Sequence, residues 1–339
     1  MGLKKAGWTG LLLASLASIA GISIQGCGGN TAGPVTNNTY YLNPTATPVG
    51  TEGQDWYFTT LNAAFSARSE QASVVYNNKM WVIAGQTGTL TNSVYYSSDG
   101  INWVLANASP AFTARHKFAV LNYNNKLWLL GGEDTSTFQN DVYTSTDGAN
   151  WTPVTVTTPF TARDGFGALV YNGKMWVIGG TTGSFKSDAW YSTDGATWTQ
   201  ATTVAGFGQR ADLSALVYNN KMWVIGGILS GTGVVNDVWS SLDGVTWTQV
   251  TASAAFAARS DMGAVVHNGK MWIAGGYGTS SSLNDVYSST DGVTWTPATS
   301  SASFSPRYGQ TMLEFNDRMW LIGGYDGLFK NDVWQSPGS

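Results

Sequence analysis

Short apolar runs, separated by polar turn signals, recur along the chain from about residue 52 onward. In the first set, the run 73–76 is followed by Asn-Asn, the run 80–83 by Ala-Gly, and the run 94–96 by Asp-Gly, after which a fourth segment surrounds Trp103. Runs this short, bounded by turn residues, indicate strands and not helices. The Asn-Asn pair is typical of a tight hairpin turn, whose two central residues need positive φ. The pattern therefore predicts a unit of four short antiparallel strands.

This unit is repeated six times. A Lys-Met-Trp triplet or a variant of it recurs at intervals of 47 to 49 residues. The triplets begin at positions 79, 126, 174, 221, 270 and 318. Four-stranded antiparallel units with this period are typical of propeller blades. We therefore predict an all-β, six-bladed β-propeller over residues 52–339, a length that equals six units of 48.

The two ends of the repeat region predict how the ring closes. The last unit stops at Trp334-Gln335-Ser336, before its own Asp-Gly-x-x-Trp segment. A spare copy of that segment, Gly53-Gln54-Asp55-Trp56, lies at the front of the region. We expect the N-terminal strand to complete the sixth blade and so to remove two exposed sheet edges.

The repeat resembles a known family. A Gly-Gly pair, an aromatic residue after a spacer, a Trp and an Arg together resemble the kelch repeat, and the resemblance covers residues 52–339. It implies a kelch-type propeller. It implies no single function, because propellers of this type serve many tasks. The first unit departs from the pattern at Ala84, which replaces the first Gly.

The N-terminal segment has the pattern of a secretion signal. Two Lys precede an apolar run at 11–24, which is too short to indicate a membrane span. The run ends in Ile-Gln-Gly-Cys, which resembles a bacterial lipobox and implies lipidation of Cys27. The alternative is ordinary signal cleavage beside an incidental Cys. We expect residues 1–26 to be a lipoprotein signal peptide.

The residues after the signal predict a cellular location and a flexible tether. Gly28 stands where an Asp retains many lipoproteins at the inner membrane, so the resemblance implies the outer membrane of a bacterial cell envelope. Residues 27–51 are rich in Gly, Asn, Thr and Pro and are expected to form a flexible tether that begins at the lipidated Cys27. The membrane is thus expected as a partner through the lipid anchor only.

Charge and donor residues exclude several classes of ligand. The chain has 17 Lys and Arg against 21 Asp and Glu, a net charge of −4. Nucleic-acid binding is not expected, since it needs clustered basic residues. Cys27 is the only Cys, and the two His occupy different places in the repeat, so His116 and His267 are expected on opposite faces. We expect no cofactor, and no metal site built from His and Cys.

Sequence variation falls on one face of the predicted propeller. The turns between the first and second strands, and between the third and fourth, have nearly the same sequence in every unit. The segments after each Arg and the loops between the second and third strands differ in sequence among units. Binding residues concentrate in such loops. The candidates at the channel mouth are Glu70, His116, Lys117, Asp164, Asp212, Asp261 and Tyr308. The candidates in the variable loops are Glu133, Phe138, Phe185, Tyr277, Tyr325 and Phe329. A solvated polar rim and loop-packing aromatic residues are the alternatives.

The repeated residues are expected to be structural. Trp in the second and fourth strands should form the core between blades, and each hairpin Asp should accept hydrogen bonds from its own turn. The repeated Arg are expected to brace neighbouring blades. They are Arg68, Arg115, Arg163, Arg210, Arg259 and Arg307. A cationic ring around an anionic ligand is the alternative.

These observations favour a non-catalytic envelope lipoprotein whose variable face binds a protein partner, with a glycan as the alternative. Copper radical oxidases share the kelch architecture, but by resemblance they need a Cys-linked Tyr and two His, which this chain does not bring together. N-acetylneuraminate mutarotases are six-bladed kelch propellers and form the enzymatic alternative, because their chemistry would need an Arg clamp and an acid/base pair.

Overall fold

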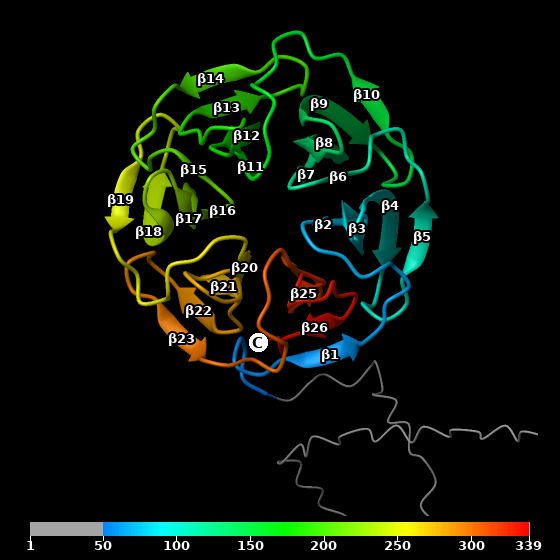
Figure 1. Ribbon diagram of the computed structural model, residues 1–339, viewed down its shortest axis with the longest axis vertical. Helices are drawn as coiled ribbons and strands as arrows, with labels where there is room; N and C mark the ends of the chain where they lie inside the picture. Colours follow the sequence, from blue (N-terminus) through cyan, green and yellow to red (C-terminus); the bar gives the residue numbers. More distant parts are fainter. Residues whose placement is uncertain (1–49, 339) are drawn as a thin grey trace, which may run out of the picture. The chain divides into compact units, whose positions relative to one another are not determined.

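The computed structural model describes residues 50–338, and every regular element in this range is a β-strand. The strands form six antiparallel sheets that are arranged as blades around a central axis (Figure 1). This confirms the predicted all-β, six-bladed propeller. Cys27, the expected signal peptide and all but the last residues of the expected tether lie outside the described residues. None of the described residues belongs to a helix long and apolar enough to cross a membrane.

The blades follow one another along the chain, each with its innermost strand first. Blade one contains β2 (Ala72–Tyr76), β3 (Lys79–Gln86), β4 (Leu90–Ser97) and β5 (Val104–Asn107). Blade two contains β6 (Arg115–His116), β7 (Ala119–Tyr123), β8 (Lys126–Asp134), β9 (Phe138–Ser145) and β10 (Thr152–Val154). Blade three contains β11 (Gly167–Tyr171), β12 (Lys174–Ile178), β13 (Ala189–Ser192) and β14 (Thr199–Thr202). Blade four contains β15 (Arg210–Ala211), β16 (Ser214–Tyr218), β17 (Lys221–Leu229), β18 (Gly233–Ser241) and β19 (Thr248–Thr251). Blade five contains β20 (Gly263–His267), β21 (Lys270–Ala274), β22 (Val286–Ser289) and β23 (Thr296–Thr299). Blade six contains β24 (Thr311–Glu314), β25 (Met319–Ile322), β26 (Val333–Gln335) and, from the other end of the chain, β1 (Tyr57–Thr60).

The sixth blade is closed by the N-terminal strand, as the sequence predicts. β1 pairs antiparallel with β26 (Figure 1), and in the register of this pair Phe58 is opposite Trp334. The hairpin that precedes the fourth strand is split between the two chain ends: the N–H of Gly53 donates to Ser336 Oγ at 2.7 Å. In the unbroken hairpin of blade one, the N–H of Gly100 donates to Ser97 Oγ at 2.8 Å. The two chain ends therefore rebuild the hairpin found in the other blades.

Neighbouring blades pack through Trp and Gly. The second-strand Trp of each blade is buried and lies against a hairpin Gly of the next blade, which follows an Asp in five blades and Glu52 in blade six. At Gly100, for example, a Cβ atom would lie 2.1 Å from the Trp320 ring, so this contact requires glycine. The hairpin Asp accepts hydrogen bonds from its own turn, as Asp99 does from the N–H groups of Ile101 and Asn102. The Asp-Gly-x-x-Trp motif thus shapes the turn and the contact between blades.

The repeated Arg residues join each blade to the one before it. The Arg163 N–H donates to the Gln139 carbonyl of blade two at 3.0 Å. Its guanidinium donates to the Gly179 carbonyl of blade three at 2.8 Å and binds both carboxylate oxygens of Asp188 at 2.6 and 2.8 Å. Arg115, Arg210, Arg259 and Arg307 make the same paired contacts with an Asp of their own blade. All six Arg are at most 1% exposed. These are the contacts of a brace, and they leave the guanidinium groups out of reach of a ligand.

Blade one lacks the carboxylate of this brace. The position held by Asp in the other five blades is Ser93, and Arg68 is bound by the hydroxyl groups of Ser66 and Ser93 and by the Ala84 carbonyl. Within residues 50–338, no carboxylate pairs with Arg68. Burial lowers the pKa of this guanidinium to about 10. A buried cation without a counter-ion is costly.

We expect Ser93→Asp to stabilise the propeller. The new carboxylate would give Arg68 the partner that the other five Arg have, which raises the free energy of unfolding by about 1–3 kcal/mol. The matched control is Asp285→Ser, which removes the carboxylate partner of Arg259 in blade five and should cost about 3–5 kcal/mol. Thermal unfolding of the three proteins measures both effects. A lower midpoint for Ser93→Asp than for the wild type would contradict this account of blade one.

Candidate functional site

One end of the propeller, here called the variable end, carries the segments after each Arg and the loops between the second and third strands of the blades. At this end the second residue after each Arg reaches the axis and forms a closed ring. In this axial ring, each N–H donates to the carbonyl of the corresponding residue in the preceding blade, at 2.7 to 3.2 Å. The members are Glu70, Lys117, Gly165, Asp212, Asp261 and Gly309.

The axial ring has an unusual backbone. All six members have positive φ, between 50° and 64°. Two of them are Gly, whereas Glu70, Lys117, Asp212 and Asp261 adopt this conformation against the preference of L-residues. Each hydrogen bond around the ring, and each Arg two residues earlier, holds the strained residue in place. Repetition of one backbone conformation thus brings side chains of very different chemistry to the axis.

Lys117 lies at the centre of the charged side chains of the axial ring. Its ammonium is 2.9 Å from Asp212, 3.8 Å from Glu70 and 3.9 Å from Asp261. Burial opposes the charge on Lys117, but the three carboxylates outweigh it and raise the pKa of the ammonium. Burial and the charge of Asp212 raise the pKa of the Asp261 carboxyl above its usual range. The ring is therefore acidic, and its own lysine partly neutralises it.

A small cavity of about 140 Å³ lies on the axis. It is lined by the axial ring and by the next residue of each blade, among them Gln71, Phe118 and Gln310. Gln71 and Gln310 each donate to a backbone carbonyl, and their carbonyl oxygens are buried without a hydrogen-bond partner in the described part of the chain. Pockets for small organic ligands usually measure about 300–1,000 Å³. The cavity suits a side-chain tip, an ion or a few water molecules.

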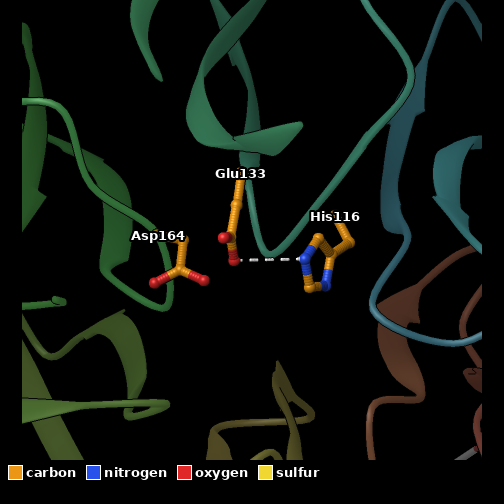
Figure 2. A group of neighbouring side chains, drawn as sticks. All are labelled: His116, Glu133 and Asp164. Atoms are coloured by element: carbon orange, nitrogen blue, oxygen red, sulfur yellow. Dashed lines mark ion pairs between the residues drawn. The ribbon is translucent and has the colours of Figure 1, made fainter. Parts of the chain in front are cut away.

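Beside the ring, between blades two and three, His116, Glu133 and Asp164 face one another (Figure 2). β6 pairs with the end of β8, which sets His116 opposite Glu133. His116 Nε2 is 3.4 Å from Glu133 Oε2, and His116 Nδ1 is 2.5 Å from Glu70 Oε2. Burial alone would lower the pKa of the His116 imidazole, but the hydrogen bond to Glu70 and the charges of Glu70 and Glu133 raise it.

Asp164 is the most enclosed member of this group. Asp164 is 5% exposed, and its Oδ1 atom has no hydrogen-bond partner within residues 50–338. Burial is the main cause that raises the pKa of this carboxyl to about 7, and the charges of Asp212 and Glu133 add to it. A buried carboxylate without a donor is destabilising. This group therefore has unused capacity to bind a cation or a hydrogen-bond donor.

Aromatic side chains form a row over blades five and six at the variable end. Tyr277, Tyr308, Tyr325 and Phe329 follow one another with edge-to-face contacts and ring centroids 5.0 to 5.6 Å apart. Tyr277 is 40% exposed, and Leu328, in the same loop as Phe329, is 71% exposed. This aromatic row presents apolar surface next to the acidic axis.

The structure divides the sequence-predicted site residues into separate sets. Glu70, Lys117, Asp212 and Asp261 converge on the axis. Three further residues that we expected at the channel mouth each come one residue before a ring member in the sequence: His116, Asp164 and Tyr308. His116 and Asp164 lie close to Glu133. Tyr308 belongs to the aromatic row with Tyr277, Tyr325 and Phe329. Phe138 and Phe185 stand apart from that row, at the start of β9 and in the loop before β13.

Sequence reasoning missed the ring Gly residues and the two buried Gln side chains. Gly165 and Gly309 are the second residue after an Arg, as Glu70 is, but they were not candidates because glycine has no side chain that could bind a ligand. Gln71 and Gln310 replace the apolar residues that the other blades place there, and this exception in the repeat is the signal that could have found them.

Comparison with known proteins gives one family. The family described as the DUF6242 beta propeller domain matches residues 56–337. No curated protein matches the chain.

We expect Lys117→Met to destabilise the propeller by about 2–4 kcal/mol, because it leaves Asp212, Glu70 and Asp261 facing one another without a cation. Adding Asp212→Asn should recover part of that loss, so the double variant should be more stable than additive losses predict. The matched control is Lys174→Met at the start of β12, outside the axial ring, which should change stability by less than about 1 kcal/mol. Thermal unfolding of Lys117→Met, Asp212→Asn, the double variant and Lys174→Met tests the coupling. Strictly additive losses would contradict it.

Proposed function

The chain belongs to the DUF6242 β-propeller family, and we propose that it is a non-catalytic binding module whose variable end engages a protein partner. The aromatic row carries this proposal. It offers exposed apolar surface on loops that differ from blade to blade, and aromatic side chains dominate the energetics of protein interfaces. The opposite end is built from the repeated turns and offers no comparable individuality.

The geometry of the axis supports a surface partner over a small substrate. The cavity of about 140 Å³ accepts one side-chain tip and not a whole sugar. A partner that packs on the aromatic row could place a polar side chain at the axial ring, whose carboxylates are hydrogen-bond acceptors. Acidic anchoring groups next to an apolar platform favour a partner surface that combines aromatic or aliphatic residues with basic ones.

A glycan is the second candidate, and the aromatic row favours it too, since sugar rings stack on exposed aromatic faces. The mutarotase alternative receives no support from the six repeated Arg, because they are enclosed and engaged by their own blades. An anionic sugar would also meet the carboxylates of the axial ring. A neutral glycan on the surface is the form of this candidate that agrees with the charges.

We also propose that the domain works at the outer membrane of a bacterial cell, held by a lipid on Cys27, and that its blades are of the kelch type. The lipobox-like Ile-Gln-Gly-Cys sequence supports the anchor, and the repeated Gly pair, Trp and Arg support the kelch assignment. A tethered propeller would keep one end free to meet a partner close to the membrane.

Site-specific photocrosslinking tests the binding surface. A photoreactive residue at Tyr277 should give a discrete protein adduct in native envelopes, and the same residue at Val245, in an exposed turn at the opposite end, should not. Purified wild-type propeller should compete the adduct away, whereas the variant Tyr277→Ala with Leu328→Asp should not compete. Equal adducts at both positions would refute the assignment of the variable end. A rise in thermal midpoint with neutral glycans but no competable adduct would favour the glycan.

Replacement of Cys27 tests the anchor separately. Cys27→Ser removes the only thiol of the chain, so the protein should lose incorporation of a clickable fatty acid and move from the membrane fraction to the soluble fraction. Ser23→Ala, within the apolar run, is the matched control and should leave both unchanged. Membrane association that survives in Cys27→Ser without label would contradict the lipid anchor.

A further inference from the structure

We propose that His116, Glu133 and Asp164 form a binding site for a divalent transition-metal ion of the Zn²⁺ or Mn²⁺ class. The site lies at the variable end between blades two and three, next to the axial ring (Figure 2). It is independent of the protein partner proposed above.

The donor atoms already lie close enough to share one ion. One ligand atom from each residue falls within 4.8 Å of the other two. Ligands bonded to such an ion at about 2.0–2.2 Å lie roughly 3.0–3.5 Å from one another. The 3.4 Å distance between His116 Nε2 and Glu133 Oε2 is of this size, so only a small movement of Asp164 would complete the set.

A second carboxylate orients the histidine. Glu70 Oε2 lies 2.5 Å from His116 Nδ1, on the side of the ring away from Glu133. With the proton on Nδ1, the imidazole directs the lone pair of Nε2 toward Glu133 and Asp164. Metal-binding histidines are commonly held in this way by a carboxylate on the other nitrogen. Glu70 is itself fixed by its place in the axial ring, so the orientation of His116 is built into the backbone.

The buried carboxylate points independently to a ligand. Asp164 is 5% exposed, yet its Oδ1 atom has no donor among the described residues. Lys117, the cation of the axial ring, is engaged by Asp212 at 2.9 Å. A bound cation would satisfy Asp164 and offset the repulsion between it and Glu133.

The donor set selects the class of ion. Imidazole nitrogen favours Zn²⁺ and other transition metals over Ca²⁺ and Mg²⁺, and the two carboxylates also accept Mn²⁺. Three protein ligands leave at least one coordination position open. Glu133 is the most exposed of the three residues, so that position would face the solvent at the variable end.

Metal titration of the residue 50–339 propeller, purified after chelation, tests the site. The folded region lies within this span, since β1 to β26 complete the ring. We expect Zn²⁺ or Mn²⁺ to bind in calorimetry with one ion per chain, and Ca²⁺ and Mg²⁺ to bind at least tenfold more weakly. Asp164→Asn and His116→Ala should each weaken binding roughly 100-fold or more. Blade four has Ala211 at the position equivalent to His116, so we expect His116→Ala to fold.

Matched controls separate a lost site from a lost fold. His267→Tyr removes the other histidine and installs the residue found at this place in four other blades, so it should bind metal as the wild type does. Metal-free Asp164→Asn should unfold at the same temperature as the wild type or higher, because it removes an unsatisfied buried carboxylate. No binding of either ion at millimolar concentration would overturn the proposal. Binding that survives in Asp164→Asn and His116→Ala, or that is lost in His267→Tyr, would also overturn it.

Discussion

Closure of the axial ring is the constraint on which the rest of this propeller depends. Six N–H groups donate to six carbonyls around the axis, and the last bond, from Glu70 to Gly309, returns to the first blade. Such a ring closes only if every blade delivers the same left-handed residue at the same radius. The repeated Arg makes this possible, because its backbone bonds to the preceding blade while its side chain is fixed in its own. The near-constant spacing of the units follows from the same geometry.

The ring fixes a backbone conformation and leaves the side chain free. Left-handed residues cost about 1–2 kcal/mol when they are not Gly, yet four of the six members are charged residues. Around this fixed backbone, the blades differ in the residue that they present, so one end of a repetitive molecule acquires an individual surface. The acidic axis, the His116 group and the aromatic row all arise from substitutions at equivalent positions of the repeat.

The fold was predictable because its residues recur in every blade. The site was only partly predictable, because it is formed by residues that differ from blade to blade. Strand order, turn chemistry and closure by the N-terminal strand followed from residues that recur, such as the Asn turns and the split hairpin at Gly53. The convergence of Glu70, Lys117, Asp212 and Asp261 also followed, since equal positions in a ring meet at its axis. The approach of Glu133 to His116 did not, because it depends on the extension of β8 beyond a bulge at Gly131. The sequence shows Ser93 where the other five blades have Asp. That this Ser leaves Arg68 without a carboxylate partner could be recognised only from the contacts that the other five Arg make.

The split hairpin also governs when the domain can finish folding. Gly53 and Ser336 are 283 residues apart, so the contact that closes the ring is among the most non-local in the chain. The entropic cost of joining the ends grows only slowly with this separation, but the contact cannot form until Ser336 has been synthesised. Five blades can assemble from neighbouring hairpins, whereas the edge of β26 stays open to any competing strand until the N-terminal segment arrives. The vulnerable period of this protein is therefore the interval between synthesis of Ser336 and the docking of β1, and a truncation that removes β26 would make that interval permanent.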